Sequence, residues 1–147
     1  MDWDDAEAAI RAHIETQWAL GSYTAIPLVF ENEDAPQSGS YMAVNIEGTF
    51  ADKSIYGSSG KRASVEGGIV FFHAFVPPGT GKGQATGPVV ALTQILELQT
   101  IGTGINLEGG NPPSPIDHGD SLEPNQQPGG MYYRCSGSVP FIVIGNR

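Results

Sequence analysis

The sequence predicts one α+β domain over residues 1–147, in which a small mixed or antiparallel sheet packs against two helices and long loops connect the elements. The hydropathy patterns run in the order helix, strands, helix, strands, and the strands mostly follow one another as hairpins do. A chain of 147 residues suits one domain. Its 20 glycines, 11 prolines and only 16% charged residues indicate loops and strands rather than a helical bundle.

A first helix is expected over residues 2–20. Apolar residues recur at helical spacing and form one stripe along it: Ala6, Ile10, Ile14 and Trp18. The acidic residues at its start suit the positive end of the helix dipole. Gly21 follows the last residue of the stripe and is a natural stop.

Two strands are expected after this helix, over residues 26–31 and 41–50. Pro27 cannot donate a ladder hydrogen bond, so it belongs at the start of the first strand or at a sheet edge. The second strand alternates apolar and polar residues, which is typical of a half-buried strand.

The strongest strand pattern covers residues 64–76. Both of its faces are apolar, so we expect this strand to be central and covered on both sides. Gly67 and Gly68 within it indicate a bulge or a close approach of two backbones.

The second half of the chain predicts a helix over residues 84–99, a short strand over 105–108 and, over 131–144, either a last pair of strands or one long bent strand. Pro88 is tolerable only in the first turn of that helix. Pro140 makes the last strand an edge strand or a bent one.

Residues 109–130 form a long loop that is rich in proline and glycine and has almost no apolar side chains. Structureless loops of this length within a domain are usually functional or disordered. We therefore expect a flexible loop inside the single domain.

The charge balance limits the partners of the protein. The formal net charge is −9 and the isoelectric point is near 4.5, which argues against a basic surface that grips DNA, RNA or an anionic membrane. No apolar run approaches a membrane span of about 18 residues, and the acidic N-terminus is unlike a signal peptide. We expect a soluble protein made in a cytoplasm.

One motif between strand and helix looks like a phosphate-binding loop, with its core at Gly79–Lys82. Val76 stands where the first glycine of that motif is required. Gly83 stands where a Ser or Thr would hold magnesium. A nucleotide-binding enzyme is therefore a remote alternative, and a Gly/Pro hinge is the simpler interpretation.

The remaining chemistry-bearing residues are scattered. His13, His73 and His118 have no metal-ligand spacing. Cys135 alternates with core-facing residues, while Arg134 points to the opposite face, so we expect a buried and inert thiol. With no nucleophile–base pair in the pattern, we expect no enzyme, no cofactor and no metal.

The order of several short motifs resembles one known family. A helix with Trp18 near its end leads into Thr24–Pro36, which reads TAIPLVFENEDAP, and the following motifs keep a fixed order to Val143: Tyr41, the Val44–Ile46 strand, Gly57, Arg62, Gly67-Gly68, an apolar strand, Pro78-Gly79-Thr80-Gly81 and a helix. In this order the chain resembles the tail terminator proteins of long-tailed bacteriophages.

The resemblance implies a structural virion protein, not an enzyme. Such minor tail proteins assemble as a six-membered ring on the finished tail tube, stop its polymerisation and provide the surface for the head–neck connector or stopper protein. DNA passes through the ring without specific binding. The expected location is the tail–neck junction of a virion assembled in the host bacterial cytoplasm. Another neck or tail-tube component is the alternative.

We expect the ring and tube contacts to come from three loops: Glu31, Glu33, Asp34 and Pro36; Lys61 and Arg62; Asp117 and Asp120. A cyclic ring joins one patch to a different patch on the neighbour. The acidic group is expected to meet Lys61 and Arg62 of the next copy. The alternative is that all are ordinary solvated charges, for which exposed pairs contribute only about 0–1 kcal/mol.

Overall fold

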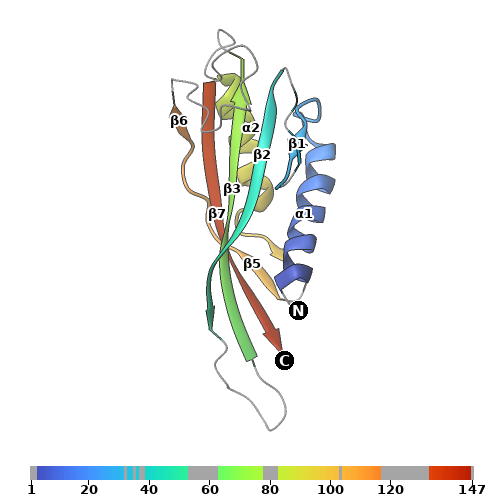
Figure 1. Ribbon diagram of the computed structural model, residues 1–147, viewed down its shortest axis with the longest axis vertical. Coiled ribbons are helices and arrows are strands. Elements are labelled where there is room, and N and C mark those ends of the chain that lie inside the picture. Colours follow the sequence, from blue (N-terminus) through green and yellow to red (C-terminus); the bar gives the residue numbers. More distant parts are fainter. Residues whose placement is uncertain are drawn as a thin grey trace.

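The computed structural model describes residues 3–31, 33–34, 36, 39–52, 63–77, 83–102, 104–116 and 133–146. Their order is α1 (Trp3–Leu20), β1 (Leu28–Val29), β2 (Tyr41–Asp52), β3 (Ala63–Val76), α2 (Gly83–Leu96), β4 (Thr100–Ile101), β5 (Ile105–Leu107), β6 (Ser114–Ile116) and β7 (Tyr133–Asn146) (Figure 1). The fold is α+β, as the sequence predicts.

All strands belong to one seven-stranded sheet with the order β1-β2-β3-β7-β5-β4, and β6 also pairs with β7. The short strand β1 runs parallel to β2, and every other pair is antiparallel. The sheet is therefore mixed. Its centre is formed by the three long strands β2, β3 and β7, which Figure 1 shows side by side.

Both helices pack on the same face of the sheet. The predicted stripe of α1 is buried in full, and α2 buries Ala85, Val89, Leu92 and Leu96. One parity of each long strand packs into the same cluster: Met42, Val44 and Ile46; Val70, Phe72, Ala74 and Val76; Cys135, Val139, Phe141 and Val143. The domain thus has one main core, between the helices and one side of the sheet.

The other face of β3, for which the sequence also predicts cover, carries no helix in the part of the chain that the structure describes. Ile69, Phe71 and His73 on this face are only partly buried, and Phe75 belongs to a separate small cluster with Tyr41. The described helices share one face, so among the described residues no helix provides cover on the second side. Figure 1 shows α2 behind the sheet, with the opposite face of β2, β3 and β7 turned to the viewer.

The predicted glycine irregularity in β3 is confirmed. The register of β2 against β3 shifts between Gly48 and Phe50, opposite Gly67 and Gly68. A Cβ on Gly68 would clash with the Glu47 carbonyl oxygen and would lie 2.6 Å from Phe141 Cζ. Only glycine permits the two strands and the core ring to approach this closely.

Proline accounts for two differences from the predicted elements. Strand β1 is shorter than the predicted 26–31. Pro27 precedes it: its carbonyl oxygen accepts a hydrogen bond from Met42 N at 2.9 Å, but its nitrogen has no hydrogen to donate. Helix α2 begins at Gly83, so Pro88 lies beyond the first turn, and the prediction for its position is wrong. The missing N–H of Pro88 removes one intrahelical bond, which the packed helix tolerates.

Strand β7 is internal rather than an edge strand. It lies between β3 and β5, and the Pro140 carbonyl accepts a hydrogen bond from Glu108 N at 2.8 Å. The nitrogen and carbonyl of one residue point to the same side of an antiparallel strand. The Pro140 nitrogen, which has no hydrogen to donate, therefore points to the side where β5 ends. The hydrogen bonds between β7 and β3 on the other side do not need it.

Two short strands are absent from the prediction. Strand β4 directly follows the range expected for the second helix, 84–99, and the helix itself stops at Leu96. Strand β6 lies inside the expected 109–130 loop. Residues 117–130 of that loop lie outside the described residues.

Candidate functional site

The acidic loop after β1 is fastened to the body of the domain by two of its three carboxylates. Glu31 Oε1 accepts the Ile46 backbone N–H at 2.6 Å, and Glu33 Oε1 accepts the Phe30 N–H at 2.8 Å. Glu33 also lies 3.3 Å from Arg11 Nη2. The hydrogen bond from Phe30 lowers the pKa of the Glu33 carboxyl, and Arg11 acts in the same direction. These two groups are structural.

Asp34 differs from both glutamates. Its side chain is exposed, and within the described part of the chain its carboxylate has no hydrogen-bond or ion-pair partner. With Pro36 it borders a hollow of about 310 Å³ beside β1, which Pro27, Leu28, Val29 and Glu33 also line. Asp34 is therefore the acidic residue of this loop that is available to a partner.

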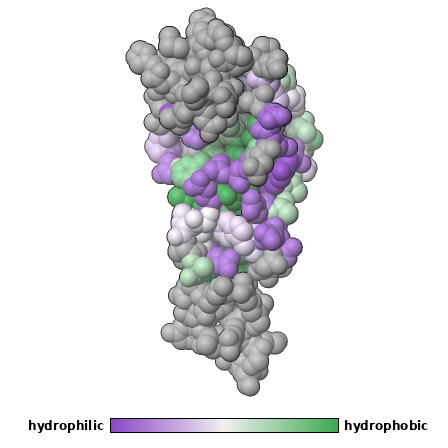
Figure 2. All heavy atoms as spheres, viewed as in Figure 1, coloured by the Kyte–Doolittle hydropathy of each residue, from purple (hydrophilic) through white to green (hydrophobic). Residues whose placement is uncertain are grey.

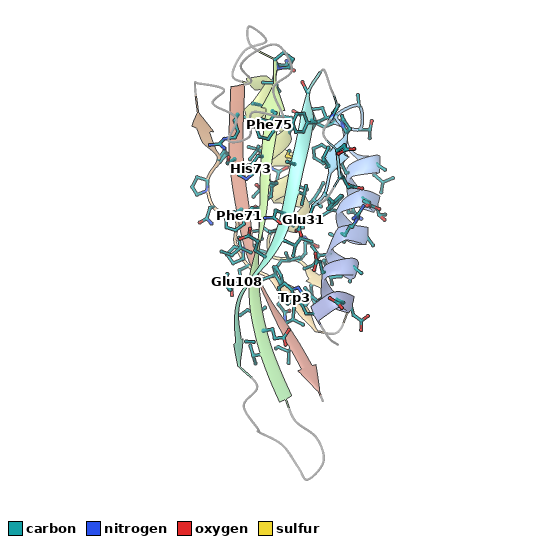
Figure 3. The ribbon with its side chains drawn as sticks, in the orientation of Figure 1. Trp3, Glu31, Phe71, His73, Phe75 and Glu108 are labelled. Carbon is teal, nitrogen blue, oxygen red and sulfur yellow. The ribbon has the colours of Figure 1, made fainter. Side chains whose placement is uncertain are left out.

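A row of side chains follows β3 on the face away from the helices. We call it the β3 ridge: Ile69, Phe71, His73 and Phe75. Figure 3 shows Phe71, His73 and Phe75 one after another along this strand. The neighbours of Phe71 in register are polar: Asn45 on β2 and Ser138 on β7. Figure 2 shows hydrophobic and hydrophilic residues side by side on this face.

His73 sits at the centre of the ridge in a half-buried position. Its Nδ1 lies 2.6 Å from the Ser136 hydroxyl oxygen. Burial lowers the pKa of His73, and the positive charge of Arg134 lowers it further. The imidazole is therefore held in its neutral form more strongly than an ordinary histidine.

Arg134 lies on the same face, on β7, in register with Phe75. The residue is only 8% exposed, yet its Nε and Nη1 have no hydrogen-bond partner in the described part of the chain. Burying a cation without a partner is costly. The sequence places Arg134 opposite to Cys135, which is confirmed, because Cys135 is fully buried among the core residues. The burial of Arg134 was missed, since it depends on which strands flank β7.

The structure brings together four of the predicted contact residues, Glu31, Glu33, Asp34 and Pro36. The other four, Lys61, Arg62, Asp117 and Asp120, lie outside the described residues, as does the Gly79–Lys82 motif. The predicted pairing of acidic and basic loops between neighbours therefore stays a prediction.

A second hollow, of about 430 Å³, lies between α1 and α2. His13 is bound there to the helix, with Nε2 lying 3.2 Å from the Ile95 carbonyl oxygen. The other polar lining residues are Gln17, Gln94 and Gln99. No group of three or more His, Cys, Asp or Glu side chains suited to a metal occurs among the described residues. Within the same residues, neither helix is long and apolar enough to cross a membrane.

Comparison with known proteins establishes the fold alone. No protein-family model matches the chain, and no curated protein matches it. A protein of known structure superposes with a TM-score of 0.60 at 16% sequence identity, over 93% of this chain and 94% of that chain. The whole domain architecture is therefore shared with another protein, at an identity too low to transfer a function.

Proposed function

We propose that this chain is the tail terminator of a long-tailed bacteriophage. Copies of the chain close into a ring on the end of the finished tail tube, and the resemblance to that family implies six copies. The ring stops tube polymerisation and joins the tail to the head–neck connector. The protein acts through its shape rather than as an enzyme, and it belongs to the virion at the tail–neck junction.

The observation that carries this proposal is the partly exposed β3 ridge. Phe71 and Ile69 lie on the central strand of the sheet, yet no helix of the described chain covers them. An apolar strip with a polar rim is typical of a surface that becomes covered on association. In a ring of identical subunits a neighbouring copy would cover this strip, whereas in a protein that works as a single copy the strip would stay exposed to water.

The charge of the chain also supports a ring around DNA. With a net charge of −9, the chain repels phosphates overall and denies them a strong binding site. DNA would then slide through the ring without being retained. The motif order from Trp18 to Val143, which resembles the tail terminators, supports the same function.

Deletion of the gene from its phage tests the proposal. A terminator mutant is expected to produce overlong tails without heads, because tube polymerisation is no longer stopped. Absent tails would instead indicate a tube or initiator component, and normal particles would reject both. Electron microscopy of the wild-type head–tail junction is expected to show a ring of this domain between tube and connector.

The enzyme alternative has its own test. The purified protein is expected to show no ATP turnover. Measurable hydrolysis that Lys82→Ala abolishes would favour a nucleotide-binding enzyme and contradict the proposal.

A further inference from the structure

We infer that Arg134 is the docking point for the Asp34 carboxylate of a second copy of this chain, so that subunits join head to tail across opposite edges of the sheet. This inference rests on the proposed ring and names the surface through which it closes. Its first support is the state of Arg134. The residue is 8% exposed, and its Nε and Nη1 lack hydrogen-bond partners in the described residues.

A guanidinium in this state calls for an anion. Removal of a cation from water is offset only when an opposite charge and hydrogen bonds replace the water. Arginine binds carboxylates with particular strength because its N–H groups are fixed in a plane. Within the described chain the nearby groups on this face do not serve: the Ser136 hydroxyl contacts His73, and Phe75 and Ile116 flank Arg134 in register.

The strand registers link the edge strand β1, beside which Asp34 lies, with the part of β7 that carries Arg134. Val29 of β1 pairs with Ala43, Ala43 with His73, His73 with Ser136, and Ser136 with Ser114 of β6. This single row crosses the sheet from edge strand β1 to edge strand β6. Arg134 is two residues along β7 from the row, one strand in from the β6 edge.

Asp34 lies beside the β1 end of the same row. It lines the hollow next to Leu28 and Val29 and is the unengaged carboxylate of its loop. A copy placed against the β6 edge with its own β1 edge facing inward would bring Asp34 to the level of Arg134. The two patches differ, so the contact is heterologous, which is the kind of contact that closes a ring.

The ridge adds area to this contact. Phe71 and His73 lie between the two edges on the same face, and both are partly exposed. The charge pair would fix the register of the neighbour, while the apolar ridge would supply burial. The occupant that fits is therefore another copy of the chain, which carries the complementary acidic loop.

Association of the purified full-length chain tests the inference, measured by native mass spectrometry and sedimentation velocity with and without purified tail tubes. Asp34→Asn and Arg134→Gln are each expected to weaken ring formation at least about tenfold. Asp4→Asn, which removes one exposed charge from α1, is the matched control and is expected to assemble as the wild type does.

A mixture of the two variants gives the sharpest result. Asp34→Asn keeps a sound Arg134 patch, and Arg134→Gln keeps a sound Asp34 patch, so one intact contact forms between them. The opposite patches of that pair are both defective. The mixture is therefore expected to form heterodimers that do not grow into rings, whereas each variant alone stays monomeric.

Folding is checked separately by circular dichroism and thermal melting. Arg134→Met is expected to melt at or above the temperature of the wild-type monomer, because it removes a buried cation whose Nε and Nη1 have no hydrogen-bond partner among the described residues. If substitution of Arg134 disrupts folding, Asp34→Lys at the exposed position still decides: it must abolish ring formation.

Three outcomes would overturn the inference. If Arg134→Gln assembles as the wild type does, Arg134 is not the docking point, while the proposed ring itself is not contradicted. Loss of assembly in Arg134→Gln, with none in Asp34→Asn or Asp34→Lys, would show that another group is the partner. A wild-type chain that forms no ring, alone or on tubes, would reject the proposed function itself together with this contact.

Discussion

Tyr41 and Phe75 stack across neighbouring strands β2 and β3, with ring centroids 4.8 Å apart and planes inclined by 17°. Both side chains are buried, although they lie on the sheet face that the helices leave uncovered. This pair therefore forms a small second core, and it limits the exposed part of the β3 ridge to the residues before Phe75.

Loss of this stack is expected to destabilise the monomer. Phe75→Ala removes a buried ring and should lower the free energy of unfolding by about 3 kcal/mol. Urea denaturation measures the change. Phe71→Ala is the matched control on the same strand: because Phe71 is less completely buried than Phe75, its effect on the monomer should be smaller. Equal losses in the two variants would contradict the second core.

Gly68→Ala tests the close approach at the bend of the sheet. The added Cβ would meet the Glu47 carbonyl and the Phe141 ring, and we expect a loss of about 1–3 kcal/mol in unfolding free energy. Gly109→Ala serves as the control, since a Cβ there meets nothing within 4 Å. Thermal melting of the two variants should separate them, and an unchanged Gly68→Ala would refute the predicted clash.

The stability of the protein is expected to decrease on acidification through the titration of His73. Burial and then Arg134 lower its pKa in the native state below the ordinary value, which is about 6.5 in the unfolded chain. Between these two pKa values the unfolded chain binds more protons, so the free energy of unfolding falls as pH falls. Denaturation at pH 7.5 and at successive values down to the native pKa should show this slope.

His73→Gln is the control for that slope, because it keeps a polar group beside Ser136 and removes the titration. In this variant the change in unfolding free energy across the same window should be smaller. Identical pH profiles for the two proteins would mean that His73 is not the group responsible.

Arg134→Gln should raise the pKa of His73, since it removes the second cause of the lowering. NMR titration of the His73 ring resonances in the wild type and in the variant measures the difference directly. An unchanged pKa would place the Arg134 charge too far from the ridge to act on it.

Glu31 is expected to anchor the acidic loop. Glu31→Ala removes the acceptor of the Ile46 N–H and should lower the free energy of unfolding by about 1 kcal/mol. Asp34→Ala, in the same loop, should leave monomer stability unchanged because its carboxylate has no partner among the described residues. Denaturation of both variants tests the division between structural and available carboxylates.

The local patterns of the sequence predict much of this fold. The α1 stripe and the alternation in β2, β3 and β7 reflect periodicities that a single element imposes on its own residues. Strand β6 could not be found in this way, because its three residues pair with β7 only through distant chain contacts. The apolar second face of β3 was also ambiguous. Its hydropathy indicates that burial of this face is favoured, but it does not indicate whether the same chain or another one buries it.

The candidate site was only partly predictable for the same reason. The acidic loop is visible in the sequence as Glu31, Glu33 and Asp34. Which of these are engaged depends on Arg11 and Ile46, which are 22 residues before Glu33 and 15 residues after Glu31. Arg134 carried one usable signal, a charged residue in a strand whose alternate positions are apolar, but its lack of partners follows from the assembled sheet.

Pro115 in β6 has a consequence for the outer edge of this strand. The backbone carbonyl oxygens of Ser138 and Pro140 accept hydrogen bonds from chain on the β5–β6 side of β7. Even-numbered residues of β7 therefore point their backbone N–H and C=O groups to that side. Pro115 pairs with the odd-numbered Cys135 and therefore turns its nitrogen outward. Within the described strand, the outer rim of β6 therefore lacks the amide hydrogen of Pro115, which makes it a poorer template for pairing with a strand of another chain.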